Sequence, residues 1–302
     1  MLNEELILLK NIRVDPVDFL SKLHTTVDVL RLDLIHPIIS GNKWFKLNEY
    51  LKEAKAFNKK IILTFGGAYS NHIVATAAAC RQIGFRSIGI IRGENPTNIS
   101  HTLQNASSYG MGLHFISRAE YENKTIPTKI LQQHKEDDIY IINEGGYGKK
   151  GAEGAKAILQ QIDSLSYTHI IDSVGTGTTL AGLINGSTKH QTIIGISSLK
   201  NNHSIQQEIE SLVSEKNKKR FSLIHDYHFG GYAKYPKQLI DFMNEWYQLT
   251  RIPSDFVYTG KLFFAVRDLL QKNYFPADSK LLIIHSGGLQ GNHSLPKGTL
   301  IF

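Results

Sequence analysis

The chain has 302 residues, of which 41% are hydrophobic, 10% aromatic and 20% charged. This composition is that of an ordinary globular protein and excludes a collagen-like, coiled-coil or disordered polymer. The 34 Lys and Arg residues outnumber the 27 Asp and Glu residues, which gives a formal net charge of +7. The only dense basic run, Lys216–Arg220 (KNKKR), is short, so we interpret it as a solvated segment rather than a nucleic-acid site.

The sequence also bears on where the protein works. No apolar run approaches the roughly 20 residues that span a bilayer, and the start, MLNEELILLK, places acidic residues beside a short apolar patch, unlike a secretory signal. Cys80 is the only cysteine, so an internal disulfide and a cysteine-based metal cluster are excluded. We expect a cytoplasmic protein with neither a membrane nor a nucleic acid as partner.

Short apolar segments alternate with helical segments along the chain. Strands are predicted, in chain order, at Lys60–Phe65, Ser87–Ile91, Leu113–Ile116, Ile139–Ile142, His169–Val174, Thr192–Ile196 and Leu281–His285. Helices are predicted at Asn71–Ile83, Asn98–Ser108, Ala152–Leu165 and Thr179–Leu183. This alternation indicates an α/β fold with mostly parallel sheets. The pattern is weakest at Glu144–Lys150, so we expect two lobes with a ligand between them.

The segment Ser173–Thr179 (SVGTGTT) lies between a predicted strand and a predicted helix. A glycine and threonine loop at a helix N-terminus presents free N–H groups and hydroxyls to a phosphate. The dinucleotide fingerprint would need glycine where Leu180 stands, and the Gly-Lys-Ser/Thr of a P-loop is absent. The loop therefore suits a phosphate monoester, with a plain βα turn as the alternative.

Two lysines, Lys43 and Lys46, lie on one face of an expected helix in SGNKWFKL. At a helix entry the dipole can lower an ammonium pKa, and the neutral amine of Lys43 could form a Schiff base with an aldehyde cofactor. The alternative is a pair of surface lysines beside a core Trp44.

A third segment, Gly66–His72 (GGAYSNH), follows the first predicted strand. Ser70 is not the nucleophile of a serine hydrolase, because Ala68 and His72 occupy the positions that need glycine. A hydroxyl and an amide at a helix N-terminus suit a carboxylate instead, and the alternative is a serine that only caps the helix. The histidines, including His285, show no metal-binding spacing, so we expect no metal site.

Together, these three segments resemble the fold-type II pyridoxal-phosphate enzymes and, more closely, the 1-aminocyclopropane-1-carboxylate deaminase/D-cysteine desulfhydrase family. The resemblance extends from Arg31–Leu34 to His285–Gly288. It implies a pyridoxal 5'-phosphate cofactor held in the cleft between two lobes, each a mostly parallel sheet flanked by helices. Residues 1–46 and 151–302 would form the larger, cofactor-binding domain, and residues 47–150 a smaller domain that closes on the substrate. It also implies a homodimer.

The resemblance assigns roles residue by residue. Lys43 matches the lysine that holds the cofactor, Lys46 a second lysine near its phosphate, and Asn71 an amide on its ring oxygen. Ser70 matches the serine that grips the substrate carboxylate. The phosphate loop matches at Gly175, Thr176, Gly177, Thr178 and Thr179, and the two active-site tyrosines match at Tyr232 and Tyr258. Either Lys43 or Tyr258 would be the base.

Two departures from the family pattern bear on the reaction. Thr259 stands where the deaminases carry a glutamate facing the pyridine nitrogen, and a neutral hydroxyl makes the ring a weaker electron sink. Thr259 therefore points to β-elimination, such as D-cysteine to pyruvate, hydrogen sulfide and ammonia. Ile35–Ser40 replaces a Gly-rich segment beside Lys43, which leaves the substrate open. The alternatives are cyclopropane-ring deamination, racemisation or dehydration, a non-catalytic cofactor-binding protein, and a nucleic-acid binder.

Overall fold

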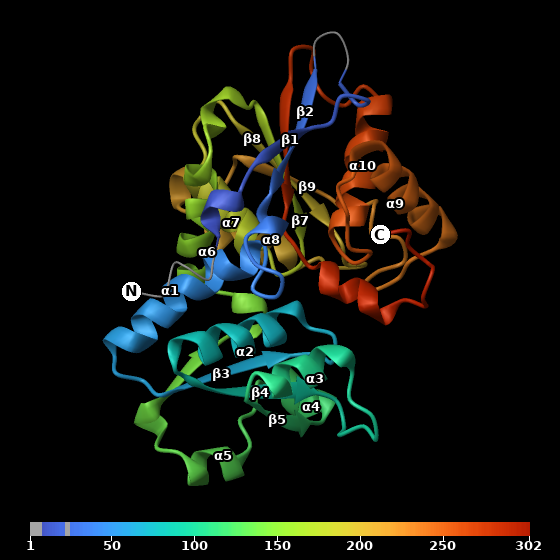
Figure 1. Ribbon diagram of the computed structural model, residues 1–302. Helices are drawn as coiled ribbons and strands as arrows, with labels where there is room; N and C mark the ends of the chain where they lie inside the picture. Colours follow the sequence, from blue (N-terminus) through green and yellow to red (C-terminus); the bar gives the residue numbers. More distant parts are fainter. Residues whose placement is uncertain (1–7, 22–24) are drawn as a thin grey trace.

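The computed structural model describes residues 8–21 and 25–302. Its strands separate into a six-stranded and a four-stranded sheet, one above the other in Figure 1. The strands are β1 (Val14–Pro16), β2 (Thr26–Arg31), β3 (Ile61–Gly66), β4 (Arg86–Arg92), β5 (Met111–Ile116), β6 (Ile139–Ile142), β7 (His169–Val174), β8 (Thr192–Ser197), β9 (Phe221–Ile224) and β10 (Lys280–His285). The α-helices are α1 (Asn42–Ala56), α2 (Asn71–Ile83), α3 (His101–Ser108), α4 (Arg118–Glu122), α5 (Thr128–Gln133), α6 (Lys149–Lys156), α7 (Thr178–Gly186), α8 (Ile205–Glu210), α9 (Lys237–Thr250) and α10 (Thr259–Gln271).

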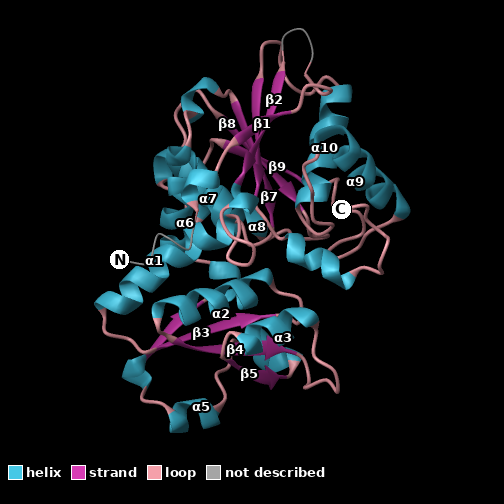
Figure 2. Cartoon of the chain, in the orientation of Figure 1, coloured by secondary structure: helices cyan, strands magenta, loops and turns pink. Residues whose placement is uncertain are grey.

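The larger sheet has the strand order β1-β2-β10-β7-β8-β9. Every neighbouring pair is parallel except β1 with β2. Helices cover both faces: α6 and α7 lie on one side and α9 and α10 on the other (Figures 1 and 2). Because both faces are covered, the central strands are apolar nearly throughout, as is typical of parallel sheets.

The smaller sheet has the order β5-β4-β3-β6 and is entirely parallel. All four strands come from residues 61–142. Loops at the carboxyl ends of parallel strands are where α/β sheets bind ligands. The loop Gly67–Ser70 and the start of α4 follow such ends, and Arg92 is the last residue of β4.

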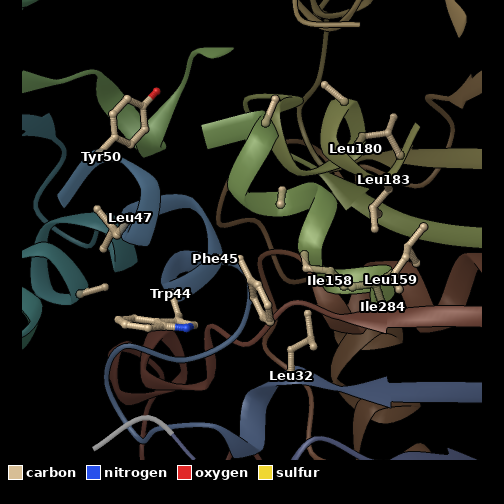
Figure 3. Close-up of a cluster of buried hydrophobic side chains, with 14 of the residues drawn as sticks. Leu32, Trp44, Phe45, Leu47, Tyr50, Ile158, Leu159, Leu180, Leu183 and Ile284 are labelled. Atoms are coloured by element: carbon tan, nitrogen blue, oxygen red, sulfur yellow. The ribbon is translucent and has the colours of Figure 1, made fainter. Parts of the chain in front are cut away.

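Alternating residues of the larger sheet build two cores. Leu30, Ile170 and Ile284 pack with α1, α6 and α7, whereas Val29, Ile171 and Ile283 pack with α9 and α10. Figure 3 shows the first core, where Phe45 of α1 lies near Ile158 and Leu159, from the turn after α6, and near Ile284 of β10. Helix α1 is therefore fixed to the larger sheet by its apolar side, which holds its N-terminus in place.

The predicted α/β architecture is confirmed, with differences in detail. The helix expected at Ala152–Leu165 begins earlier, at Lys149, and gives way to a 3-10 turn at Ala157–Gln161. Glycines explain the early start: a Cβ on Gly154 would lie 2.0 Å from the Phe45 carbonyl oxygen, so α6 packs directly on the α1 backbone. The expected domain boundary at residues 46 and 47 falls inside α1, and the domain limits stay a prediction.

Two further predictions concern the membrane and the amino terminus. Among the described helices, none has both the length and the apolarity needed to cross a membrane. Most of the segment interpreted as unlike a secretory signal, residues 1–7, lies outside the described residues.

Candidate active site

A cavity of about 780 Å³ lies between the carboxyl ends of the two sheets. Its wall contains all but one of the predicted site residues: Lys43, Lys46, Ser70, Asn71, Gly175, Thr176, Gly177, Thr178, Thr179, Tyr232 and Tyr258. These residues come from loops and helix ends that lie far apart in the sequence. The exception is Thr259, which contributes nothing to the cavity wall.

The start of α1 positions Lys43. Gly41 precedes the helix with a φ of 63°, and a Cβ there would lie 1.9 Å from the Ser286 carbonyl oxygen, so only glycine fits. The next residue, Asn42, bridges two site residues: its Oδ1 accepts a hydrogen bond from Lys43 Nζ at 2.7 Å, and its Nδ2 donates to Thr179 Oγ1 at 2.8 Å. Asn42 therefore couples the lysine to the predicted phosphate loop.

Burial sets the charge state of the two lysines. It lowers the pKa of Lys43 to about 8, against the opposing charges of Asp172 and Asp255. Burial and the charge of Lys43 also lower the pKa of Lys46, which donates a hydrogen bond to the Gly145 carbonyl. Lys43 is therefore about one tenth neutral at pH 7 and about half neutral at pH 8, and the neutral amine is the form that reacts with an aldehyde.

Asp172 is a buried carboxylate behind the cavity wall. It lies on β7 between Ile170 and Val174, which face the apolar core under α1 and α7. Its exposed fraction is 0%, and neither carboxylate oxygen has a hydrogen-bond partner among the described residues. Burial raises its pKa to about 7, partly offset by the nearby Ser173 amide and by the charges of Lys46 and Lys43. Asp172 can therefore change charge near neutral pH.

The phosphate loop has the shape of an anion cradle. Gly177 has a φ of 73° at the N-cap of α7, and a Cβ there would lie 2.4 Å from Ile209. The hydroxyls of Thr176 and Thr178 lie 3.2 Å apart beside this turn. The free N–H groups of the first turn of α7 and two hydroxyls thus face one point, which suits the oxygens of a phosphate.

The start of α2 forms the opposite wall. Ser70 caps this helix, its Oγ accepting from the Ile73 amide at 3.4 Å, so the capping alternative and the lining of the cavity both hold. The side-chain oxygen of Asn71 is buried without a partner among the described residues. The helix N-terminus and the Ser70 hydroxyl suit an anionic group, and the Nδ2 of Asn71, as a donor, suits a ring oxygen, while its orphaned Oδ1 can only accept.

His72 has a fixed tautomer. Thr64 Oγ1 lies 2.7 Å from the Ile142 carbonyl oxygen and 2.8 Å from His72 Nε2. Because the single hydroxyl proton goes to the carbonyl, Nε2 must donate its proton to Thr64. Burial and the charges of Lys46 and Lys43 lower the pKa of His72. The ring is therefore neutral, and Nδ1, which has no partner within the described chain, is a buried acceptor at the cavity.

The two tyrosines meet above the phosphate loop. Their ring centroids are 6.5 Å apart, and the Tyr258 ring would lie 3.2 Å from a Cβ on Gly175. Burial raises the pKa of Tyr258 well above its ordinary value, so this phenol keeps its proton.

Asp255 fixes Tyr258 and accounts for the position of Thr259. Its carboxylate accepts hydrogen bonds from the amides of Val257, Tyr258 and Thr259 at 2.9, 3.0 and 2.9 Å, and from Thr259 Oγ1 at 2.8 Å. Thr259 is 0% exposed. Its hydroxyl is occupied by this cap, while hydroxyls of Ser173 and Ser286, 3.4 Å apart, do line the cavity.

The residues fit a bound pyridoxal phosphate. An anion cradle, a lysine with a lowered pKa and the donor Nδ2 of Asn71 lie in one cavity and match the phosphate, aldehyde and ring oxygen of that cofactor. Sequence reasoning missed Asn42, His72, Asp172, Asp255 and Ser286. Asn42 and Ser286 are themselves part of the motifs SGNK and HSGG and could have been included, whereas nothing in the sequence marks Asp172 as facing two lysines.

Comparison with known proteins identifies the family. The chain belongs to the pyridoxal-phosphate dependent enzymes, whose family pattern matches residues 10–287. It is 29% identical to a putative 1-aminocyclopropane-1-carboxylate deaminase of Thermotoga maritima, over 93% of this chain and 96% of that protein. It is 27% identical to the mitochondrial bifunctional D-cysteine desulfhydrase/1-aminocyclopropane-1-carboxylate deaminase of Arabidopsis thaliana, over 88% of this chain and 73% of that protein.

Solved structures agree on the fold. The crystal structure of a 1-aminocyclopropane-1-carboxylate deaminase homologue superposes with a TM-score of 0.81 at 24% identity, covering 93% of this chain and 90% of that one. The predicted family, the fold-type II architecture and the pyridoxal 5'-phosphate cofactor are thereby confirmed.

Proposed function

We propose that the chain is a pyridoxal-phosphate lyase that eliminates the β-substituent of a small amino acid, with D-cysteine as the first substrate to test. One observation carries the proposal: Lys43 and the carboxylate-binding start of α2 line the same cavity as the phosphate loop. The bound cofactor would serve as an electron sink for the carbanion at the α-carbon. The names of the relatives support both a desulfhydrase and a deaminase.

The charge and position of each residue in the cavity suggest its role in the reaction. The Ser70 hydroxyl and the first amides of α2 would hold the substrate carboxylate. Lys43, with a pKa near 8, would accept the α-proton at Nζ. Tyr258 keeps its proton because of burial, which assigns it to proton donation. The phosphate loop and Lys46 would anchor the cofactor.

Neutral hydroxyls in the wall favour elimination over ring opening. Ser286 adjoins the start of α1, since its carbonyl accepts from the Asn42 amide at 3.2 Å, and its hydroxyl lies beside that of Ser173. We assign to this pair the ring-facing role that the family resemblance implied for Thr259. A neutral hydroxyl keeps a pyridine nitrogen protonated far less than a carboxylate does, which makes the ring a weaker electron sink. A reaction with a good leaving group on the β-carbon is therefore favoured over ring opening.

Product analysis tests this proposal. D-cysteine and water should give pyruvate, ammonia and hydrogen sulfide in equal amounts, and Lys43→Ala should abolish all three. Ring-opened 2-oxo acid from 1-aminocyclopropane-1-carboxylate without sulfide from D-cysteine would establish the deaminase instead. Inverted amino acid without 2-oxo acid would establish a racemase.

We also infer a cytoplasmic homodimer. The family resemblance supports the dimer, and the single cysteine, Cys80, buried and unpaired, is compatible with a reducing compartment. Light scattering should give twice the 33.9 kDa of one chain, and a mass of one chain would contradict the dimer.

A further inference from the structure

A second cavity adjoins the active site at the carboxyl end of the smaller sheet. It has a volume of about 540 Å³ and is lined by Arg92, Arg118, Tyr121, Glu122, Lys124 and Glu144. Arg92, Arg118 and Glu144 also line the active-site cavity. The two spaces therefore share a wall that carries two guanidinium groups.

Neighbouring strand ends bring the two arginines together. Arg92 is the last residue of β4 and pairs in register with Ile116, the last residue of β5. The Gly93 amide donates to the Ile116 carbonyl at 2.9 Å, and Arg118 follows two residues later. Both side chains thus leave the carboxyl edge of the sheet, the edge where α/β sheets bind ligands.

Arg92 also lies beside the carboxylate-binding loop. Its Nη2 is 3.8 Å from the position a Cβ on Gly67 would take, three residues before Ser70. Its positive charge reaches Tyr232, whose pKa it lowers against the larger upward effects of burial and Asp255. A substrate held by Ser70 therefore has Arg92 within reach of its side chain.

The charges in this second cavity are unevenly compensated. Lys124 forms an ion pair with Glu144 at 2.6 Å, and Glu122 adds a second acid to the wall. In contrast, neither Arg92 nor Arg118 forms an ion pair or a side-chain hydrogen bond with any residue in the ranges 8–21 and 25–302. The contact of Arg92 is with the ring of Tyr121, 5.8 Å from its centroid. Two guanidinium groups thus face the cavity without an acid bound to them.

We propose that Arg92 and Arg118 bind a second anionic group, on the side chain of the substrate. The inference rests on the proposed function and extends it to amino acids whose β-substituent carries a carboxylate, sulfonate or phosphate. Guanidinium groups bind such oxyanions through paired N–H donors. For a carboxymethyl thioether of cysteine, water and the amino acid would give pyruvate, ammonia and mercaptoacetate, with the acid leaving on the thiol.

A ligand without a leaving group tests the subsite separately from the reaction. D-2-aminoadipate has the length of S-carboxymethylcysteine and cannot eliminate, and its side-chain amide has the same shape without the charge. Calorimetry on the holoenzyme should show the acid binding at least about tenfold more tightly than the amide. Arg92→Gln and Arg118→Gln should each reduce this ratio, and the double variant should bring it to about one.

Arg86→Gln is the matched control. Arg86 is an exposed arginine at the other end of β4, so this variant should retain the full preference for the acid. Equal binding of acid and amide by the unmodified protein, no binding of the acid, or an unchanged ratio in the double variant would each overturn the subsite. Sulfide release from D-cysteine is measured in parallel. If the protein prefers the acid but releases no sulfide, the proposed function alone is contradicted. If it releases sulfide but shows no preference for the acid, the subsite alone is contradicted.

Discussion

The two walls of the active-site cavity differ in how their polar groups are satisfied. On the wall formed by the larger sheet, Asn42 joins Lys43 to Thr179, and Asp255 accepts four hydrogen bonds around Tyr258. On the wall formed by the smaller sheet, the arginine side chains project from strand ends and are exposed. A cofactor of constant shape needs a preformed site, whereas substrates are selected by groups that still have free donors.

The largest expected effect of breaking the ordered wall is on stability. Asp255→Ala leaves three backbone amides and the Thr259 hydroxyl without their acceptor, so we expect the free energy of unfolding to fall by about 3–5 kcal/mol. Urea denaturation of the apoprotein measures this loss of unfolding free energy. Asp241→Ala, which removes an exposed ion pair with Lys237, should cost less than about 1 kcal/mol. A similar loss of unfolding free energy in both variants would show that the hydrogen bonds to Asp255 stabilise the protein no more than an exposed ion pair does.

Asp172 is the exception on the same wall, because neither of its carboxylate oxygens has a hydrogen-bond partner among the described residues, and it predicts a pH dependence. Its pKa is raised to about 7, whereas the unfolded chain ionises near 4. The folded state therefore binds an extra proton between these values, and stability falls as the pH rises from 4 to 7. Asp172→Asn should remove this loss, gaining on the order of 2–4 kcal/mol over the wild type across that range.

The control for Asp172 is an exposed carboxylate. Asp163→Asn should show no such gain, because Asp163 lies at the surface. Denaturation of the three apoproteins at pH 4.5 and 7.5 gives the comparison. A stability difference between Asp172→Asn and wild type that stays constant with pH would mean that Asp172 is ionised throughout.

A smaller effect is expected on the substrate wall. Ser70→Ala removes a cap and, in our proposal, a carboxylate contact, so it should cost about 1 kcal/mol of stability and raise KM about tenfold. Ser117→Ala removes the equivalent cap of α4, where the Ser117 hydroxyl contacts only Glu120 of its own helix, and it should lower stability by a similar amount without raising KM. A KM increase of the same size in both variants would assign the effect of Ser70 to capping alone.

The same two walls explain what could be predicted from sequence. Strand β7 and the loop after it were predictable because an apolar run ends at glycines and threonines, a local pattern. Lys43, Ser70 and Tyr258 were found because the motifs around them resemble a known family. The fold class followed from the alternation of strands and helices.

What escaped prediction depends on contacts between distant segments. Thr259 was expected to face the cofactor because it follows Tyr258, yet Asp255 turns its hydroxyl into the helix cap. In the sequence, Asp172 is a single polar residue in an apolar strand. Only the packing of β7 under α1 places it near Lys43 and Lys46. The exposed arginines of the smaller sheet carry no motif at all, so their convergence is visible only in three dimensions.

The central claim is that Lys43, rather than the buried Lys46 or Lys261, holds the cofactor. Lys261 is its sharpest rival: it is 0% exposed, its pKa is lowered to about 8 by burial, and its Nζ donates to the Gly231 carbonyl at 2.7 Å. Borohydride reduction of the holoenzyme followed by peptide mass spectrometry reports the lysine that carries the cofactor. We predict a pyridoxyl group on Lys43 alone; the same group on Lys46 or Lys261, with Lys43 unmodified, would contradict the account.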